Sequence, residues 1–179
     1  RQGFMNAASP GVISLFLQND WYDNRQDYLQ ALAEAMRVEY RTIIESGLDL
    51  QLDCPDLALS RHMLFADLSD AEFVEVAESH VKALNFVLDG LPKEKIRIHI
   101  CWGNYEGPHI CDIPMDSVFA TLMKAHARYV LFETSNPRHA HEWTVFEKRK
   151  DEIPADKILV PGVLDTTTNF VEHPELVAQ

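Results

Sequence analysis

The stretch IRIHICWGN (residues 96–104) gives the clearest indication of the fold. Its alternating isoleucines predict a strand over residues 96–101, which Gly103 and Asn104 bring to an end. Because side chains alternate along a strand, His99 and Cys101 share one face and Ile100 lies on the other. Polar side chains at the end of an apolar strand are typical of parallel α/β proteins, whose sites form where the strands end.

On both sides of this stretch, strand patterns alternate with longer helical patterns. Strands are predicted over residues 11–17, 48–53, 96–101, 129–133 and 158–163. Helices are predicted over residues 24–46, 69–88, 115–127 and 139–150, and another begins near Glu172. Each strand is interpreted as a continuous apolar run, as expected when both faces of a parallel sheet are covered. The order βαβαβαβαβα indicates a single α/β domain over residues 1–179.

Two architectures fit this order: an open doubly wound sheet, and about five units of an eight-unit βα barrel. The doubly wound fold predicts a glycine-rich phosphate loop after the first strand. The sequence there, LFLQNDWYDNRQDY, contains no glycine. We therefore expect the C-terminal part of a TIM barrel, cut from a larger domain at both ends. Its open sheet edges predict that it either associates, with a homo-oligomer as one form, or aggregates.

Composition limits the partners. The chain has 16 Lys+Arg against 28 Asp+Glu and a formal net charge of −12, which disfavours binding to nucleic acid. No apolar run approaches the ~18 residues of a membrane span, so no membrane partner is expected. The chain has 3 cysteines, which argues against a disulfide framework and for a reducing compartment, with a cytoplasmic location expected.

Side chains suited to chemistry follow the predicted strands at their carboxyl ends. They are Asp53, His99, Cys101, Glu133 and Asp165. In a parallel fold these ends face one side of the sheet. The imidazole of His99 and the thiolate of Cys101 can share a metal ion, and zinc accepts this mixture of nitrogen and sulfur. Glu133, from the next strand, is a candidate third ligand. A packed strand with an ordinary histidine and a core cysteine remains the alternative.

Other candidates lie in the connecting segments. Cys111 has ligand chemistry, but its loop position favours a bystander thiol. His109 also lies in a loop and is a candidate for contact with substrate. His139 and His141 are two residues apart at a predicted helix start, so they do not share a helical face. They are interpreted as surface or capping residues.

Three segments together resemble the catalytic barrel of cobalamin-independent methionine synthase and its shorter relatives, which include the epoxyalkane:coenzyme M transferases. The segments are IRIHICWGNYEGPH, RYVLFETSN and KILVPGVLDTTTNFVEHPELVA. In addition, LDLQLDCPDLAL resembles the segment in which a family strand ends in an Asp that is followed by one residue and Pro. The resemblance extends over about residues 9–179.

This resemblance implies a TIM barrel with a zinc ion at the carboxyl ends of the strands. It assigns His99, Cys101 and Glu133 as metal ligands, Asp53 as a residue that holds the thiol substrate, and Asp165 as a pocket residue. The implied reaction is methyl transfer from methyltetrahydrofolate to homocysteine or a similar thiol, as in methionine biosynthesis. Its partners are a small-molecule thiol and an alkyl donor, and its cofactor is Zn²⁺.

Two departures from the family pattern leave alternatives open. The distal Cys ligand of the family is expected beyond residue 179, unless Cys111 replaces it. Cys54 stands where the synthase has Glu, which weakens the case for recognition of an amino acid. Alkylation of a thiol by an epoxide, as in the coenzyme M transferases, is one alternative, and a non-catalytic barrel fragment is another. A decarboxylase barrel of the uroporphyrinogen type is disfavoured, because that chemistry uses Asp and Arg clusters without zinc.

Overall fold

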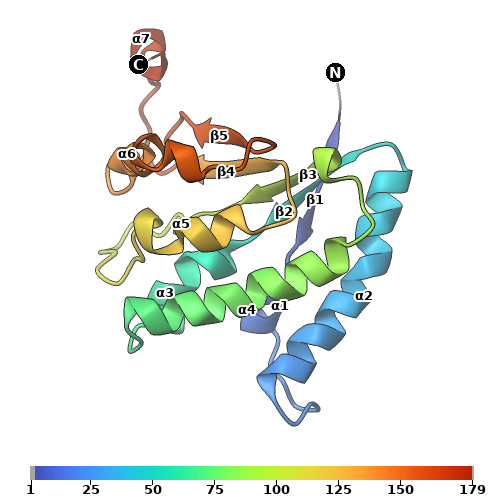
Figure 1. The fold of residues 1–179 in the computed structure, drawn as a ribbon. Coiled ribbons are helices and arrows are strands. Elements are labelled where there is room, and N and C mark those ends of the chain that lie inside the picture. Colours follow the sequence, from blue (N-terminus) through green and yellow to red (C-terminus); the bar gives the residue numbers. More distant parts are fainter. Residues whose placement is uncertain (1–2, 179) are drawn as a thin grey trace.

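Five parallel strands form one sheet in the computed structural model, which describes residues 3–178. They are β1 (Phe4–Ala8), β2 (Asp49–Asp53), β3 (Ile96–His99), β4 (Tyr129–Glu133) and β5 (Ile158–Gly162). The spatial order β1-β2-β3-β4-β5 follows the order in the sequence (Figure 1). A doubly wound sheet reverses its strand order at a switch point, and this sheet does not.

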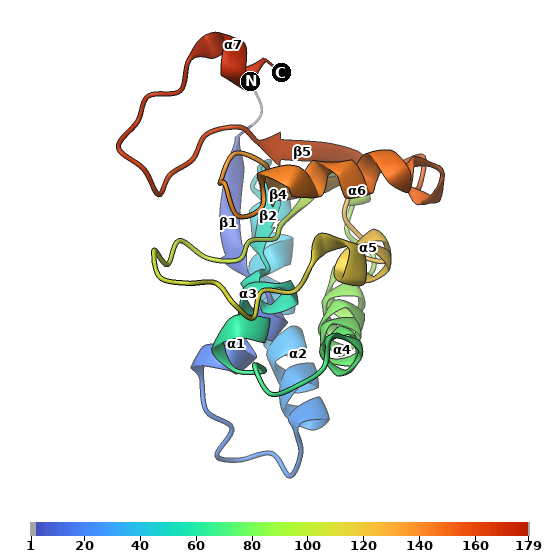
Figure 2. The same ribbon diagram turned by 90° about the vertical axis from the view of Figure 1, so that its left-hand side faces the viewer.

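Helices connect the strands. They are α1 (Pro10–Phe16), α2 (Arg25–Glu45), α3 (Leu59–Met63), α4 (Asp70–Leu88), α5 (Met115–Met123), α6 (Trp143–Lys148) and α7 (Pro174–Val177). Short 3₁₀ turns cover Pro55–Leu57, Lys93–Lys95, Ala140–Glu142 and Lys150–Glu152. The connecting helices α2, α4, α5 and α6 lie on one side of the sheet (Figures 1 and 2). This arrangement is consistent with part of an α/β barrel. No helix within residues 3–178 is long and apolar enough to cross a membrane.

The first predicted strand is wrong, because residues 10–16 form helix α1. The hydroxyl of Ser9 accepts a hydrogen bond from the Val12 N–H, and Pro10 occupies the first helical turn, where its missing N–H costs nothing. The first strand is instead Phe4–Ala8, which pairs with β2. The chain therefore turns into a helix directly after its first strand.

The prediction that both sheet faces are covered is also wrong for the described residues. In β2, Leu50 and Leu52 are fully buried against the helices, whereas Gln51 and Asp53 alternate with them on the other face. The same alternation places Arg97 in β3 on the uncovered face. The core therefore lies between the sheet and its helices. The helices leave the opposite face of the sheet uncovered, and a functional site can form there.

Local signals set the two long helices where the sequence predicts them. The Asn24 side chain accepts from the Asp27 N–H at the start of α2. Ser69 and Glu72 form a reciprocal capping box at the start of α4.

The third strand ends at His99, two residues earlier than predicted, so Cys101 belongs to the loop that follows. The predicted helix over residues 139–150 is broken into α6 and two flanking turns.

Candidate functional site

The clearest polar pair on the open face joins two neighbouring strands. Asp53 and His99 are register partners at the carboxyl ends of β2 and β3. The Nδ1–H of His99 donates to Oδ1 of Asp53 over 2.7 Å. Both side chains are accessible, at 53% for Asp53 and 37% for His99. The hydrogen bond fixes the ring and leaves Nε2 as the nitrogen that can bind a ligand.

The thiol of Cys101 lies just beyond this pair. Burial raises the pKa of Cys101 to about 11; a hydrogen bond from the Gly103 backbone opposes this effect, and the charges of Asp53 and Glu133 add to it. The thiol is therefore protonated at neutral pH in the absence of a metal. Binding of a metal ion by this sulfur must release a proton.

The carboxylate of Glu133 lies at the end of β4. Its Oε1 accepts hydrogen bonds from the Ser135 N–H, the Ser135 hydroxyl and the Asn136 N–H, at 2.7, 2.9 and 3.0 Å. These bonds hold the carboxylate in the turn after the strand. Its second oxygen, Oε2, takes part in none of them and remains able to serve as a ligand.

Asp165 lies apart from the Asp53–His99 pair. Asp53 and His99 line a cavity of about 500 Å³ with residues of β1 and β2. Asp165 lines a different cavity of about 810 Å³, together with Thr134, Ser135 and apolar side chains of the C-terminal segment. Hydrogen bonds from Thr167 lower the pKa of Asp165, so its carboxylate is charged at neutral pH. Asp165 therefore lines a cavity that is separate from the one at the Asp53–His99 pair, and its role in a substrate pocket stays a prediction.

The predicted zinc ligands lie at the ends of the adjacent strands β3 and β4 or, for Cys101, in the loop just after β3, and their donor atoms suit the metal. A histidine whose other nitrogen donates to a carboxylate is the usual arrangement of a metal-binding histidine, and His99 has it through Asp53. Sulfur from Cys101 and oxygen from Glu133 complete a donor set that zinc accepts. The ligand atoms of these three residues do not form a preassembled cluster among the described residues. Their role in zinc binding therefore remains a prediction.

Sequence reasoning missed a buried polar network behind the strand ends. Oδ1 of Asp56 accepts from the Ser9 hydroxyl at 2.6 Å, and Oδ2 lies 3.0 Å from Nδ1 of His80. The Arg25 guanidinium, which can only donate, lies 2.9 Å from Nε2 of His80. His80 is therefore neutral, with its proton on Nδ1. The network ties α1, α2 and α4 to the turn after β2, and Asp56 is only 1% exposed.

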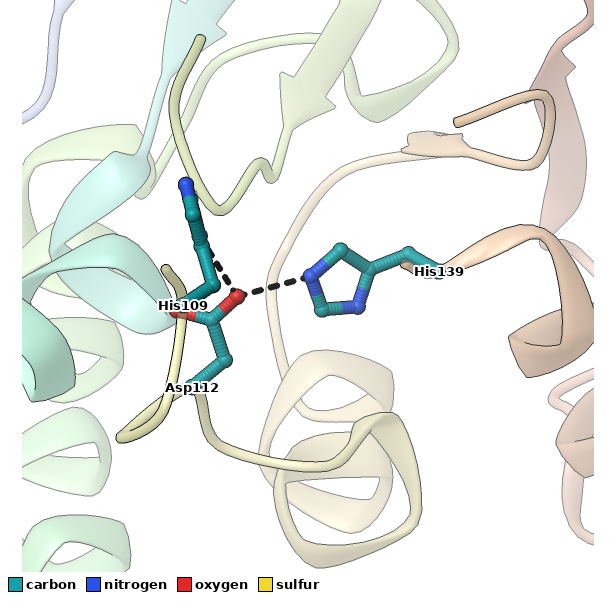
Figure 3. A group of neighbouring side chains, drawn as sticks. All are labelled: His109, Asp112 and His139. Atoms are coloured by element: carbon teal, nitrogen blue, oxygen red, sulfur yellow. Dashed lines mark hydrogen bonds and ion pairs between the residues drawn. The ribbon is translucent and has the colours of Figure 1, made fainter. Parts of the chain in front are cut away.

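A second group of histidines lies in the loops that follow β3 and β4 (Figure 3). Oδ2 of Asp112 lies 2.7 Å from Nδ1 of His109 and 2.8 Å from Nε2 of His139. The interpretation of His139 as a surface or capping residue is wrong, because it is 6% exposed and makes no side-chain cap. Burial acts to lower the pKa of His139, but the hydrogen bond to Asp112 and the nearby carboxylate of Glu142 outweigh it and raise the pKa.

Fold and site together define a parallel α/β domain with imidazole, thiol and carboxylate groups where its central strands end. No family model matches the chain. A methionine synthase from Saccharolobus solfataricus is 30% identical over 112 residues, which make up 61% of this chain. Methionine synthases from two strains of Saccharolobus islandicus, L.S.2.15 and M.14.25, are 29% identical over the same number of residues.

These relatives are distant and partial. The aligned segment spans about 30% of the length of the curated relatives that the chain matches. The similarity therefore supports a methionine synthase-like relationship and leaves substrate and metal to be tested.

Proposed function

We propose that this chain belongs to a zinc-dependent methyltransferase that methylates a thiol, with homocysteine as the thiol and a methylated folate as the donor. The observation that carries the proposal is the Asp53–His99 hydrogen bond on the open sheet face, with Cys101 in the loop just after β3 and Glu133 at the end of β4. The methionine synthases among its distant relatives support the same reaction.

In this proposal His99, Cys101 and Glu133 hold the metal ion and transfer no protons. Asp53 orients His99 through Oδ1. Its Oδ2 takes no part in that bond, and the side chain is 53% exposed, so it can pair with the ammonium group of an amino-acid thiol. A free thiol has a pKa of ~8.5, so the substrate thiol is mostly protonated at neutral pH. Bound zinc would remove its proton and supply the nucleophilic thiolate.

The open face must also admit a donor. Asp165, charged and in a separate cavity beside the turn after β4, is proposed to contact substrate or donor without touching the metal ion. Apolar side chains in that cavity, Trp143 and Phe170 among them, suit a flat aromatic donor such as a pterin.

The test uses the whole protein and measures both zinc content and methyl transfer from methyltetrahydrofolate to homocysteine. Cys101→Ser is expected to lose the zinc ion bound by His99, Cys101 and Glu133, and with it methyl transfer, because a hydroxyl is a poor zinc ligand. Cys111→Ser, the same change ten residues further on in a loop, serves as the matched control and is expected to keep both. Equal zinc in wild type and Cys101→Ser, or none in the wild type, would overturn the metal assignment. Zinc binding without methyl transfer would overturn the reaction.

A further inference from the structure

We propose that His109, Asp112 and His139 bind a divalent transition-metal ion at a second site, and that this ion joins the loop after β3 to the loop after β4. The site shares no residue with His99, Cys101 and Glu133. Among the described residues this is the group of metal-ligating side chains whose ligand atoms lie within 4.8 Å of one another. The proposal does not depend on the reaction proposed above.

Both imidazole rings point a nitrogen at the same carboxylate oxygen (Figure 3). Nδ1 of His109 and Nε2 of His139 lie 2.7 and 2.8 Å from Oδ2 of Asp112. Around a zinc ion with bonds of ~2.0–2.2 Å, such atoms would lie about 3.3 Å apart. Small shifts of the side chains therefore suffice to admit the ion.

The other nitrogen of each ring determines where the protons are. Nε2 of His109 lies 2.7 Å from the carbonyl oxygen of Tyr105, which can only accept, so Nε2 carries a proton. In a neutral ring, Nδ1 then presents its lone pair to a carboxylate oxygen. That contact is repulsive unless a proton or a metal ion lies between the two atoms.

His139 differs from His109 at its second nitrogen, which is buried and has no hydrogen-bond partner among the described residues. Its Nδ1 faces Oε1 of Glu142 at 3.7 Å, while its Nε2 faces Asp112. A neutral His139 can donate its Nε2–H to Oδ2 of Asp112, so the contact that needs a proton or a cation between its two atoms is the one from Nδ1 of His109 to the same oxygen. Metal-binding histidines commonly direct their second nitrogen to a backbone carbonyl or a carboxylate, and His109 does so through the Tyr105 carbonyl.

Burial strengthens the case for a cation. The side chains of His109, Asp112 and His139 are 2%, 8% and 8% exposed. Oδ1 of Asp112 is buried and has no hydrogen-bond partner among residues 3–178. An unpartnered carboxylate oxygen is costly in such surroundings, and a metal ion would satisfy it.

The class of ion follows from the donor atoms. Two imidazole nitrogens and a carboxylate oxygen suit zinc and other divalent first-row transition metals, whereas magnesium and calcium prefer oxygen ligands alone. Aromatic packing closes the site: the rings of Trp102 and His139 stack at 4.0 Å, and those of His62 and His109 at 5.4 Å. A closed site indicates a structural ion.

The experiment places all variants of the whole protein on a Cys101→Ser background, which removes the thiolate ligand of the other site. Zinc content after dialysis is measured for this background and for the background carrying Asp112→Asn. Glu106→Gln, an exposed carboxylate changed to an amide in the same loop, is the matched control. We expect about one zinc per chain in the background and in the control, and a loss of at least 100-fold in affinity with Asp112→Asn.

Cobalt substitution gives a second readout that does not depend on folding of the Asp112 variant. Cobalt bound to the Cys101→Ser background is expected to show ligand-field bands without a thiolate charge-transfer band, since this site has no sulfur. Two outcomes would overturn the proposal: no zinc or cobalt in the Cys101→Ser background, or equal metal with and without Asp112→Asn. The cluster would then be a hydrogen-bonded group in which a proton lies between Nδ1 of His109 and Oδ2 of Asp112. Neither outcome bears on whether wild type and Cys101→Ser differ in zinc, which tests the proposed function.

Discussion

Nδ1 of His99 lies 2.7 Å from Oδ1 of Asp53. The two residues are paired with each other in the sheet and are the last residues of β3 and β2. The bond lies on the sheet face that the helices leave open. It holds the imidazole in one orientation without contributing to the core, since both side chains are accessible. A residue that acts in this way affects ligand binding more than folding.

Replacement of Asp53 by alanine should therefore weaken zinc binding about 10–100-fold, the usual effect of removing a partner of a metal-binding histidine. The free energy of unfolding of the metal-free protein should change by less than about 0.5 kcal/mol, as for other exposed positions. Competition with a chromogenic chelator measures the affinity.

Asp49→Ala is the matched control, since Asp49 lies at the opposite end of the same strand and on the same face. Its zinc affinity should equal that of the wild type. Equal losses in both variants would show that the effect is one of general charge and not of the hydrogen bond to His99.

The buried network around Asp56 leaves no room at Gly11. A Cβ atom at this position would lie 2.0 Å from Oδ2 of Asp56 and 2.8 Å from Nδ1 of His80. Gly11→Ala should lower the free energy of unfolding by about 3 kcal/mol, because overpacking disrupts a buried hydrogen-bonded group. Urea denaturation followed by circular dichroism measures the loss.

Gly90→Ala provides the comparison. No atom lies within 4 Å of the place where alanine would put its methyl group, but the φ of Gly90 is +80°, so only backbone strain of about 1 kcal/mol is expected. A Gly11 variant as stable as the Gly90 variant would contradict the tight packing of the network.

The capping box at the start of α4 should stabilise the protein, so its removal should lower the free energy of unfolding. Ser69→Ala removes the acceptor of the Glu72 N–H and should cost about 1 kcal/mol. Ser79→Ala, inside the same helix, should be neutral or slightly stabilising, because alanine has the higher helix propensity. Thermal melting of the two variants compares them, and an equal effect would argue against the cap.

Lys157 predicts a dependence on pH. Its ammonium donates to the carbonyl oxygens of Ala125 and Ala127, and burial lowers its pKa to about 8. Between pH 8 and about 10.5 the unfolded chain binds more protons at this residue than the folded chain. The contribution of Lys157 to stability should therefore rise with pH across this window.

Lys157→Met isolates this effect. The free energy of unfolding of the wild type minus that of the variant should increase by about 1–2 kcal/mol from pH 8 to pH 10. This range already includes a reduction, because solvent screens a side chain that is only partly desolvated. Urea denaturation at a series of pH values measures it. A constant or falling difference would show that the ammonium is not desolvated in the folded protein.

Much of the secondary structure can be predicted because its signals are local. The caps at Asn24 and Ser69 and the apolar spacing of the following residues define α2 and α4. The prediction of a strand over residues 11–17 is wrong because an apolar run of this length suits a strand or a buried helix. Ser9 and Pro10, which begin the helix, decide between them. The strand Phe4–Ala8 escapes prediction because Phe4 and Met5 are exposed at 47% and 50%, so its pattern is not that of a buried strand.

The sequence by itself determined that Asp53, His99 and Glu133 would share one edge of the sheet, because parallel strands bring their carboxyl ends to the same side. Only the tertiary structure decided which of them touch. The Asp53–His99 bond depends on the register of β2 and β3, and the meeting of Asp112 with His139 depends on how two loops fold over the strand ends. Strand and helix preferences act over a few neighbouring residues. Contacts between residues 27 or 46 positions apart depend on how the whole chain packs its core.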